Sequence, residues 1–446
     1  MTSSAHIMED KATPTAGARR AAAAPLPLAV SPTLEINERV AELRRAGKDI
    51  LHLGFGEAGL PVHPLFRDAL ASAAHLNSYG PVEGNGALRA AVAGWFTRRG
   101  LPTDAGLVAV TPGSKAGLFA LLLALPGDVV LGRPSWVSYA PQAVMLAKRV
   151  IAHPTPAVTG GIPDPATLPE ALAHHRRHGL DPRIIVVTVP DNPTGTYPDA
   201  GLLAQLAEVA CSEGLTIIAD QIYAELAYDP AAVPDVAAMA PEATFVTTGL
   251  SKAFALGGWR FGVVRVPANE LGERTRTRLR AIGSEIWSCV PGPIAAAAQI
   301  AYERPAELSS YLDDARAVHA GVCSAVYEIA RHAGLSCRPP QAAFYVYPSL
   351  HDGGCPAWSA DDVAAELLER QSVAVLPGTA FGDDPALLRF RVATSLLYGA
   401  CDEERWETLQ SARQGNVLSL PGIASALDRV DAGFSALVAA HARVHR

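Results

Sequence analysis

Short apolar runs alternate with amphipathic stretches between about residues 66 and 304, and this alternation constrains the fold more than any other feature. Amphipathic stretches such as 202–211 separate the apolar runs. The clearest strand-like runs are 107–111, 128–131, 183–189, 215–219, 244–248 and 262–266. Alternation of this kind predicts a mainly parallel sheet that is covered by helices.

Polar or small residues follow several of these runs at the point where each predicted strand ends. Asn192, Asp220 and Lys252 come after the runs at 183–189, 215–219 and 244–248. Gly113-Ser114 follows the run at 107–111. In open α/β sheets, ligands bind at the carboxyl ends of the strands. The pattern therefore predicts one binding site at one edge of the sheet.

The 446 residues are enough for two domains with a large core. Before the alternating region, a helix is expected over 31–45 and a strand over 50–53. After it, a long helix from Glu307, strands at 344–348 and 388–392, and a helix at 360–370 form a smaller α+β unit.

Composition excludes several classes of protein. The net charge of -7 argues against a nucleic-acid-binding surface. No apolar run reaches the roughly 18 residues that a membrane-spanning helix needs. The six cysteines have no CxxC spacing, so we expect neither a disulfide framework nor a metal site, and a cytoplasmic location. Residues 1–30 are rich in Ala and Pro and are expected to form a disordered tail rather than an export signal.

The stretch from Gly249 to Gly262, GLSKAFALGGWRFG, carries the strongest functional signal. It resembles the lysine segment of the class I/II aminotransferase family, whose enzymes depend on pyridoxal phosphate (PLP). In that family the lysine forms a Schiff base with the cofactor, which assigns Lys252. The arginine eight residues later, Arg260, would bind the cofactor phosphate. Further family motifs precede this one, in the family's order.

The resemblance extends to the residues around the cofactor ring. Asp220 and Tyr223 match a D-x-x-Y motif at a strand end, and Asn192 lies in a turn close to N-P-T-G. By resemblance, Asp220 would keep the ring nitrogen protonated. Asn192 and Tyr223 would hydrogen-bond the phenolic oxygen, and Trp136 would stack on the ring.

The phosphate site is implied by Gly113-Ser114-Lys115, where small residues open a helix whose N–H groups favour a dianion. Ser251 would add another contact, although Gly249 stands where the family often has a second serine. In relatives, the residue that matches Tyr79 reaches the phosphate of the neighbouring subunit, which implies a homodimer with shared active sites.

The substrate α-carboxylate would be bound by Arg389, by alignment on the Ala-Thr-Ser sequence that follows it, together with Gly56, Asn192 and Trp136. Arg391 stands where the family has a small polar residue. Three roles stay open for Arg391: the true carboxylate clamp, a second substrate contact, or a strand residue facing away. Residues 57–60 also depart from the family's pattern, beside the substrate.

The implied architecture is the fold type I of PLP-dependent transferases, with a seven-stranded, mostly parallel sheet in a large domain and a smaller α+β domain. We expect residues 31–65 to belong to the small domain, 66–305 to the large PLP-binding domain, and 306–446 to the small domain again.

The implied activity is transfer of an amino group between an L-amino acid and a 2-oxo acid. An alternative is a PLP enzyme of the same fold that eliminates or replaces a side-chain group, or oxidises its substrate. Lys115 either faces a dicarboxylate substrate or lies in solvent. Glu285 and Trp287 suggest a cationic or large amino acid. A transcription regulator is disfavoured, because only about 30 residues precede the catalytic body.

Overall fold

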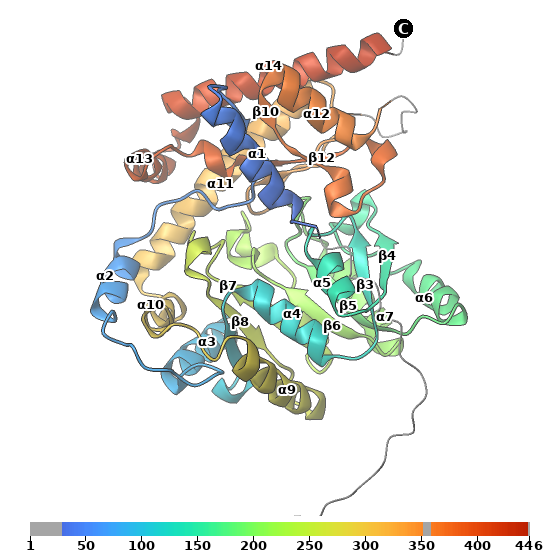
Figure 1. Ribbon diagram of the computed structural model, residues 1–446, viewed down its shortest axis with the longest axis vertical. Helices are drawn as coiled ribbons and strands as arrows, with labels where there is room; N and C mark the ends of the chain where they lie inside the picture. Colours follow the sequence, from blue (N-terminus) through green and yellow to red (C-terminus); the bar gives the residue numbers. More distant parts are fainter. Residues whose placement is uncertain (1–28, 351–357, 445–446) are drawn as a thin grey trace, which may run out of the picture.

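The computed structural model describes residues 29–350 and 358–444, and it is built around a seven-stranded sheet (Figure 1). The strand order is β2-β8-β7-β6-β5-β3-β4, and β8 runs antiparallel to both of its neighbours while the other pairs are parallel. The strands are β2 (Val108–Thr111), β3 (Asp128–Arg133), β4 (Val150–Pro154), β5 (Pro182–Thr188), β6 (Thr216–Asp220), β7 (Thr244–Gly249) and β8 (Gly262–Arg265). The mostly parallel α/β sheet that the sequence predicts is confirmed.

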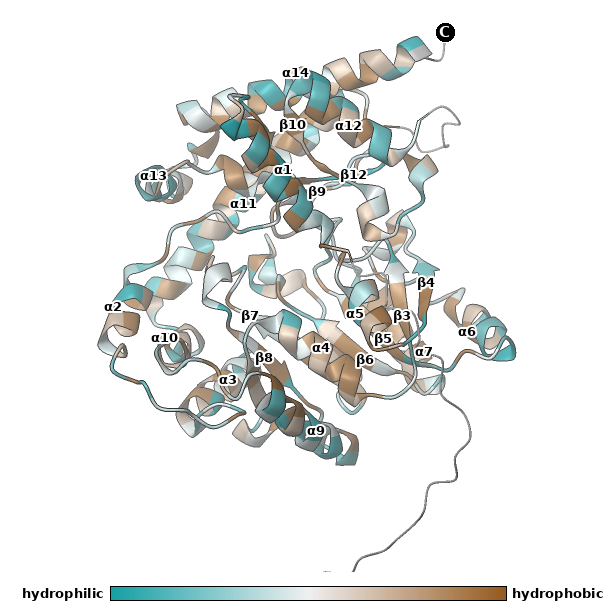
Figure 2. Ribbon diagram, viewed as in Figure 1, coloured by the Kyte–Doolittle hydropathy of each residue, from teal (hydrophilic) through white to brown (hydrophobic). Residues whose placement is uncertain are grey.

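Helices cover both faces of this sheet, because its strands are apolar on both sides (Figure 2). In β5, Ile184 and Val186 pack in one core cluster, whereas Ile185 and Val187 pack in the other. Alternate side chains of a strand point to opposite faces, so the two clusters are the two faces of the sheet. Helices α4 (Ser114–Ala124), α5 (Tyr139–Met145) and α9 (Glu270–Ile286) cover one face, and α3 (Gly86–Arg98), α6 (Leu168–Arg177) and α7 (Ala200–Ser212) cover the other.

A second group of elements lies beyond one edge of this sheet, at the top of Figure 1. It contains a three-stranded antiparallel sheet, β11-β12-β9, and a parallel pair, β1-β10. Its strands are β1 (Leu51–His52), β9 (Tyr345–Val346), β10 (Val373–Ala374), β11 (Leu376–Pro377) and β12 (Phe390–Ala393). Its helices are α1 (Pro32–Arg45), α11 (Ala306–His332), α12 (Ala360–Gln371), α13 (Asp402–Ala412) and α14 (Pro421–Val444).

Two further helices, α2 (Pro64–Ser72) and α10 (Gly292–Glu303), pack against each other, and α10 also packs against α3. The pairing of β1 with β10 joins the first described part of the chain to its last third. The proposed domain boundaries stay a prediction. The expected tail over residues 1–30 falls almost entirely outside the described residues.

The predicted binding edge is formed by the carboxyl ends of β2, β5, β6 and β7. Asp220 is the last residue of β6, Asn192 follows β5, and Lys252 follows β7. Ser114 begins α4 directly after β2. All four side chains line one cavity, at the edge where the sequence predicts a binding site.

Candidate functional site

A large cavity, with a volume of about 540 Å³, lies between the seven-stranded sheet and the second group of elements. Ten of the residues predicted from sequence line it: Gly56, Ser114, Lys115, Trp136, Asn192, Asp220, Tyr223, Ser251, Lys252 and Arg260. Three others, Tyr79, Gly113 and Arg389, are not among the residues that line it.

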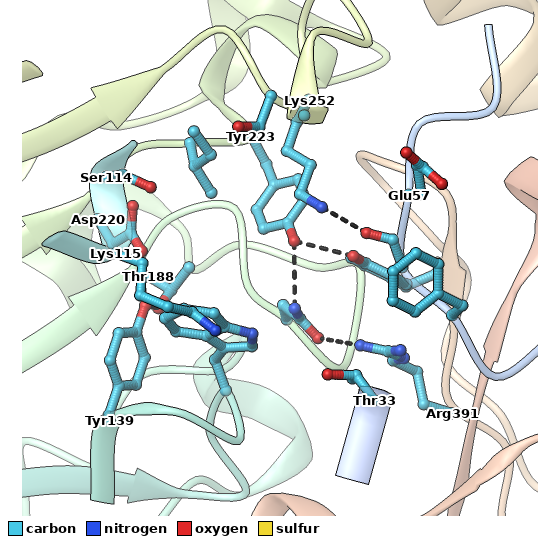
Figure 3. A pocket seen from close by; sticks show the side chains of 18 of the residues that line it. Thr33, Glu57, Ser114, Lys115, Tyr139, Thr188, Asp220, Tyr223, Lys252 and Arg391 are labelled. Carbon is cyan, nitrogen blue, oxygen red and sulfur yellow. Dashed lines mark hydrogen bonds between the residues drawn. The ribbon is translucent and has the colours of Figure 1, made fainter. Parts of the chain in front are cut away.

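Lys252 lines the cavity and extends into it from the top of Figure 3, with Asp220 on the left and Arg391 on the right. Its Nζ donates a hydrogen bond to the carbonyl oxygen of Gly56. Burial is the main cause that lowers the pKa of the Lys252 amine to about 8, and the positive charge of Arg391 contributes next. A minor fraction of this amine is therefore neutral, and nucleophilic, near physiological pH, and this fraction is far larger than for an ordinary lysine.

Asp220 is held at the end of β6 with only one of its carboxylate oxygens satisfied. Its Oδ2 accepts a hydrogen bond of 2.8 Å from the hydroxyl of Tyr139, which also lies 2.7 Å from Thr188 Oγ1. Its Oδ1 is buried and has no hydrogen-bond partner among the described residues. Burial raises the pKa of the Asp220 carboxyl to about 6. An unused buried acceptor of this kind suits a ligand that presents a charged N–H group.

Asn192 connects two aromatic hydroxyls to an arginine. Its Nδ2 donates to the Tyr223 hydroxyl at 3.1 Å, and that hydroxyl lies 2.8 Å from the hydroxyl of Tyr345. Its Oδ1 accepts from Arg391 Nη1 at 3.0 Å. The network fixes the amide orientation of Asn192, because its oxygen must face the guanidinium.

Arg391 is a buried cation, 1% exposed, in the cavity wall. Its Nη2 donates to the carbonyl oxygen of Gly54 at 2.8 Å, and its guanidinium carbon lies 4.7 Å and 4.9 Å from the ring centres of Tyr345 and Phe381. Its Nε has no hydrogen-bond partner, and no carboxylate pairs with it, within residues 29–350 and 358–444. Burial lowers the pKa of this guanidinium.

A tight turn brings the start of α4 against Arg260. Gly113, the residue before α4, has φ of 88°, and a Cβ there would lie 2.2 Å from Arg260 Nη2. A Cβ on Gly262 would lie 2.3 Å from the backbone nitrogen of Ser114. Only glycine fits either position, so the guanidinium and the N–H groups that open α4 converge. This combination would suit an anion.

Arg389 lies on the other side of the cavity wall. Its Nη1 is 3.3 Å from Asp383 Oδ2, and it lines a smaller neighbouring cavity instead of the large one. Tyr79 is 88% exposed and lies outside both cavities. Trp287 packs against Gly283 at the end of α9, and Glu285 is exposed, so neither lines the large cavity within this chain.

Several lining residues have no counterpart in the predicted set. Tyr345, Tyr139 and Thr188 complete the hydrogen-bond networks, while Thr33 from α1 and Glu57 lie on the far side from Asp220 (Figure 3). Tyr139 was visible in the sequence as the residue that closes Pro-Ser-Trp-Val-Ser-Tyr after β3. No sequence signal marks Tyr345, which reaches the site through β9.

Comparison with known proteins gives consistent matches. The family described as aminotransferase class I and II matches residues 48–396. An aspartate aminotransferase of Geobacillus stearothermophilus is 32% identical over 83% of this chain and 93% of its own length. A probable aspartate/prephenate aminotransferase of Thermus aquaticus is 34% identical over 79% of this chain and 89% of its own.

Solved structures agree with the sequence matches. The aspartate aminotransferase of Thermus thermophilus, solved with maleate, superposes with a TM-score of 0.73 at 28% identity, covering 88% of this chain and 97% of that one. That of Rhizobium meliloti gives a TM-score of 0.73 at 26% identity, covering 90% and 97%.

Proposed function

The chain belongs to the class I and II aminotransferase family, and from this premise we propose that it transfers the amino group of a dicarboxylic L-amino acid to a 2-oxo acid. That it is a PLP-dependent aminotransferase follows from the family and its relatives. The choice of substrates and the role of each residue are the proposal. The names of the relatives favour amino-group transfer over the elimination, replacement and oxidation chemistry that the sequence alone left open.

The residues of the cavity fit PLP. The unpartnered Oδ1 of Asp220 suits a protonated ring nitrogen, and the anion site of Ser114 and Arg260 suits the phosphate. Asn192 and Tyr223 supply donors for a phenolic oxygen, and Lys252 supplies the amine that the aldehyde requires. When bound, PLP supplies an electron-accepting ring that stabilises negative charge at the substrate Cα.

The chain's own residues then position and move protons. Asp220, whose orientation Tyr139 fixes, would hold the proton on the ring nitrogen. The amine of Lys252 would take the proton from the substrate Cα and deliver it to the cofactor carbon that receives the amino group. The lowered pKa of its amine suits this work near neutral pH. Trp136 would limit the tilt of the ring.

We assign the substrate α-carboxylate to Arg391, and its buried, unpaired guanidinium is the observation that carries the proposal. A cation that is 1% exposed is costly without a counter-ion, and a planar carboxylate is the counter-ion that a guanidinium fork fits. Arg389, which the sequence favours for this role, already faces Asp383. Gly56 stays a predicted contact to the same carboxylate.

A second carboxylate on the substrate would be attracted by Lys115. Its Nζ lies 5.1 Å from the ring centre of Trp136, at the cavity, and burial together with the charge of Arg260 lowers the pKa of this amine. Maleate, a dicarboxylate, was present in the Thermus thermophilus structure, and the relatives are named for aspartate. Aspartate or glutamate is therefore the proposed amino donor.

The test is steady-state kinetics with aspartate, glutamate, alanine and arginine on matched variants. Arg391→Gln should lower kcat/KM for every amino acid by about 30-fold or more, because a charge-assisted contact worth at least about 2 kcal/mol is lost. Arg389→Gln should change it less than about threefold. Lys115→Gln should affect aspartate and glutamate alone. The reverse ranking of the two arginines would restore Arg389 as the clamp.

We also propose a homodimer and a cytoplasmic location. The exposed Tyr79 supports the dimer, since a side chain of that size is seldom left 88% exposed to water.

All five cysteines among the described residues are free, which suits the reducing cytoplasm. Across the same residues, no helix is both long and apolar enough to cross a membrane.

A further inference from the structure

A second cavity of about 210 Å³ lies directly behind one wall of the large one. Loops that follow β3, β4 and β5 form one side of it, including Thr155 and Thr194. The other side comes from the second group of elements and includes Cys337, Arg338, Tyr347 and Arg389. We call this space the Arg338 cavity. It lies between the two parts of the molecule, beside the proposed active site.

The two cavities share their wall in a regular way. Asn192 lines the large cavity, and Thr194, two residues later, lines the Arg338 cavity. Arg391 lines the large cavity, and Arg389, two residues earlier, lines the Arg338 cavity. In the same way, Trp136 and Tyr345 line the large cavity, while Pro134 and Tyr347 line the Arg338 cavity. The two cavities therefore lie on opposite sides of the same segments.

The charges in the Arg338 cavity do not balance. Arg389 pairs with Asp383, whose Oδ2 also accepts a hydrogen bond of 2.9 Å from the Tyr347 hydroxyl. Arg338 is half-buried and donates to the carbonyl oxygen of Ala157, but among the described residues it forms no ion pair. The two guanidiniums are close enough to repel each other.

The nearest buried carboxyl group, Asp191, compensates Arg338 only in part. Its Oδ2 accepts hydrogen bonds from Thr194, at 2.6 Å from Oγ1 and 3.2 Å from the backbone nitrogen. Burial raises the pKa of the Asp191 carboxyl to about 7, so it carries a fraction of a charge near neutral pH. The cavity thus keeps a net positive charge.

We propose that the Arg338 cavity binds a small oxyanion between the guanidiniums of Arg338 and Arg389. A half-buried cation without a counter-ion favours an anionic ligand, and two guanidiniums offer the forked donors that phosphate and carboxylate groups accept. A volume of about 210 Å³ has room for such an anion with bound water. The bound anion would link the sheet loops to the second group of elements and stabilise their arrangement.

The test uses holoenzyme saturated with PLP, so that the phosphate site at Ser114 is already filled. Inorganic phosphate and acetate are titrated calorimetrically against chloride at matched ionic strength, and the melting temperature is followed in parallel. One saturable site per chain and a rise in melting temperature are expected. Tighter binding of phosphate would indicate a phosphate-bearing ligand, and tighter binding of acetate a carboxylate.

Arg338→Gln should weaken this binding at least tenfold, and Arg338→Lys, which keeps the charge but not the fork, several-fold. Arg338→Lys decides the matter should the glutamine variant fold poorly. Arg183→Gln is the matched control, because Arg183 is exposed and pairs with Asp181 far from the cavity, and it should change nothing. The proposal is overturned if neither anion binds saturably, or if Arg391→Gln abolishes the binding while Arg338→Gln leaves it intact.

Discussion

Lys252 combines a reactive amine with an environment that lowers its proton affinity. The pKa falls from 10.5 to about 8, first through burial and then through Arg391. The neutral amine therefore predominates above pH 8 instead of above pH 10.5. Between these values the unfolded chain binds more protons than the folded one, so this group makes the folded apoenzyme more stable as pH rises.

We predict that the rate at which apoenzyme captures PLP increases with pH along a titration curve whose midpoint lies near pH 8. Arg391→Met removes one of the charges that disfavour the ammonium form, so its midpoint should be higher. The visible absorbance that develops after mixing measures the rate, and Arg183→Gln serves as control. A wild-type midpoint above pH 10, or one that Arg391→Met leaves in place, would contradict this account.

Asp220 is expected to act through its charge. Asp220→Asn keeps the shape and a hydrogen-bonding group but loses the charge that would hold the ring proton, so kcat should fall on the order of 10²- to 10³-fold. Tyr139→Phe removes only one hydrogen bond to the same carboxylate and should cost no more than about tenfold. Single-turnover kinetics on both variants, after absorbance has shown equal PLP content, compares them. Equal losses would assign Asp220 a purely structural role.

The turn before α4 depends on Gly113 for two separable reasons, its left-handed φ and its contact with Arg260. Gly113→Ala should therefore lower both stability and PLP affinity, the latter by about tenfold or more. Gly100→Ala has a similar φ of 82° with no atom within 4 Å of the new Cβ, so it should cost only about 1–3 kcal/mol of stability. Equilibrium dialysis with PLP separates the two effects. Unchanged affinity in Gly113→Ala would remove the turn from the cofactor site.

The elements of the large sheet were predictable because each is a run of apolar residues bounded by polar or small ones. β4 was missed, since Val150–Pro154 holds His153 and ends in proline, and its burial is incomplete. The short strands β9 and β12 were placed within two residues of their observed positions. Their apolar content was visible, but their true ends depend on tertiary contacts.

The cofactor side of the site was predictable for a related reason. Asn192, Asp220 and Lys252 follow strands, and strand ends determine where their side chains go. The substrate side was harder, because Arg389 and Arg391 are two residues apart in the predicted strand over 388–392, and strand periodicity assigns them the same face. In the structure Asp383 pairs with Arg389, whereas the ring of Phe381 packs against Arg391. No local sequence pattern predicts the path of the segment that carries these two partners.

At the scale of the whole molecule, we predict a dimer of twice the 46.6 kDa chain mass, with Tyr79 serving the partner's cofactor. Lys252→Ala and Tyr79→Ala should each be impaired as pure proteins. When unfolded together and refolded as a mixture, hybrids contain one site with both residues intact. Roughly a quarter of all sites should then be active. Sedimentation measures the mass, and an assay with aspartate measures the activity. If the refolded mixture is no more active than the two parent variants, Tyr79 acts in the active site of its own subunit.

The walls of the large cavity come from two different sheets. The strand ends that carry Asp220 and Lys252 belong to one, while Arg391 and Tyr345 are carried by the other and Thr33 by the helix beside it. Substrate preference is thus a trait that selection can alter without touching the reaction centre. A library randomised at Thr33, Leu34 and Phe55 should yield enzymes with new amino-acid preferences that still bind their coenzyme as tightly as the parent.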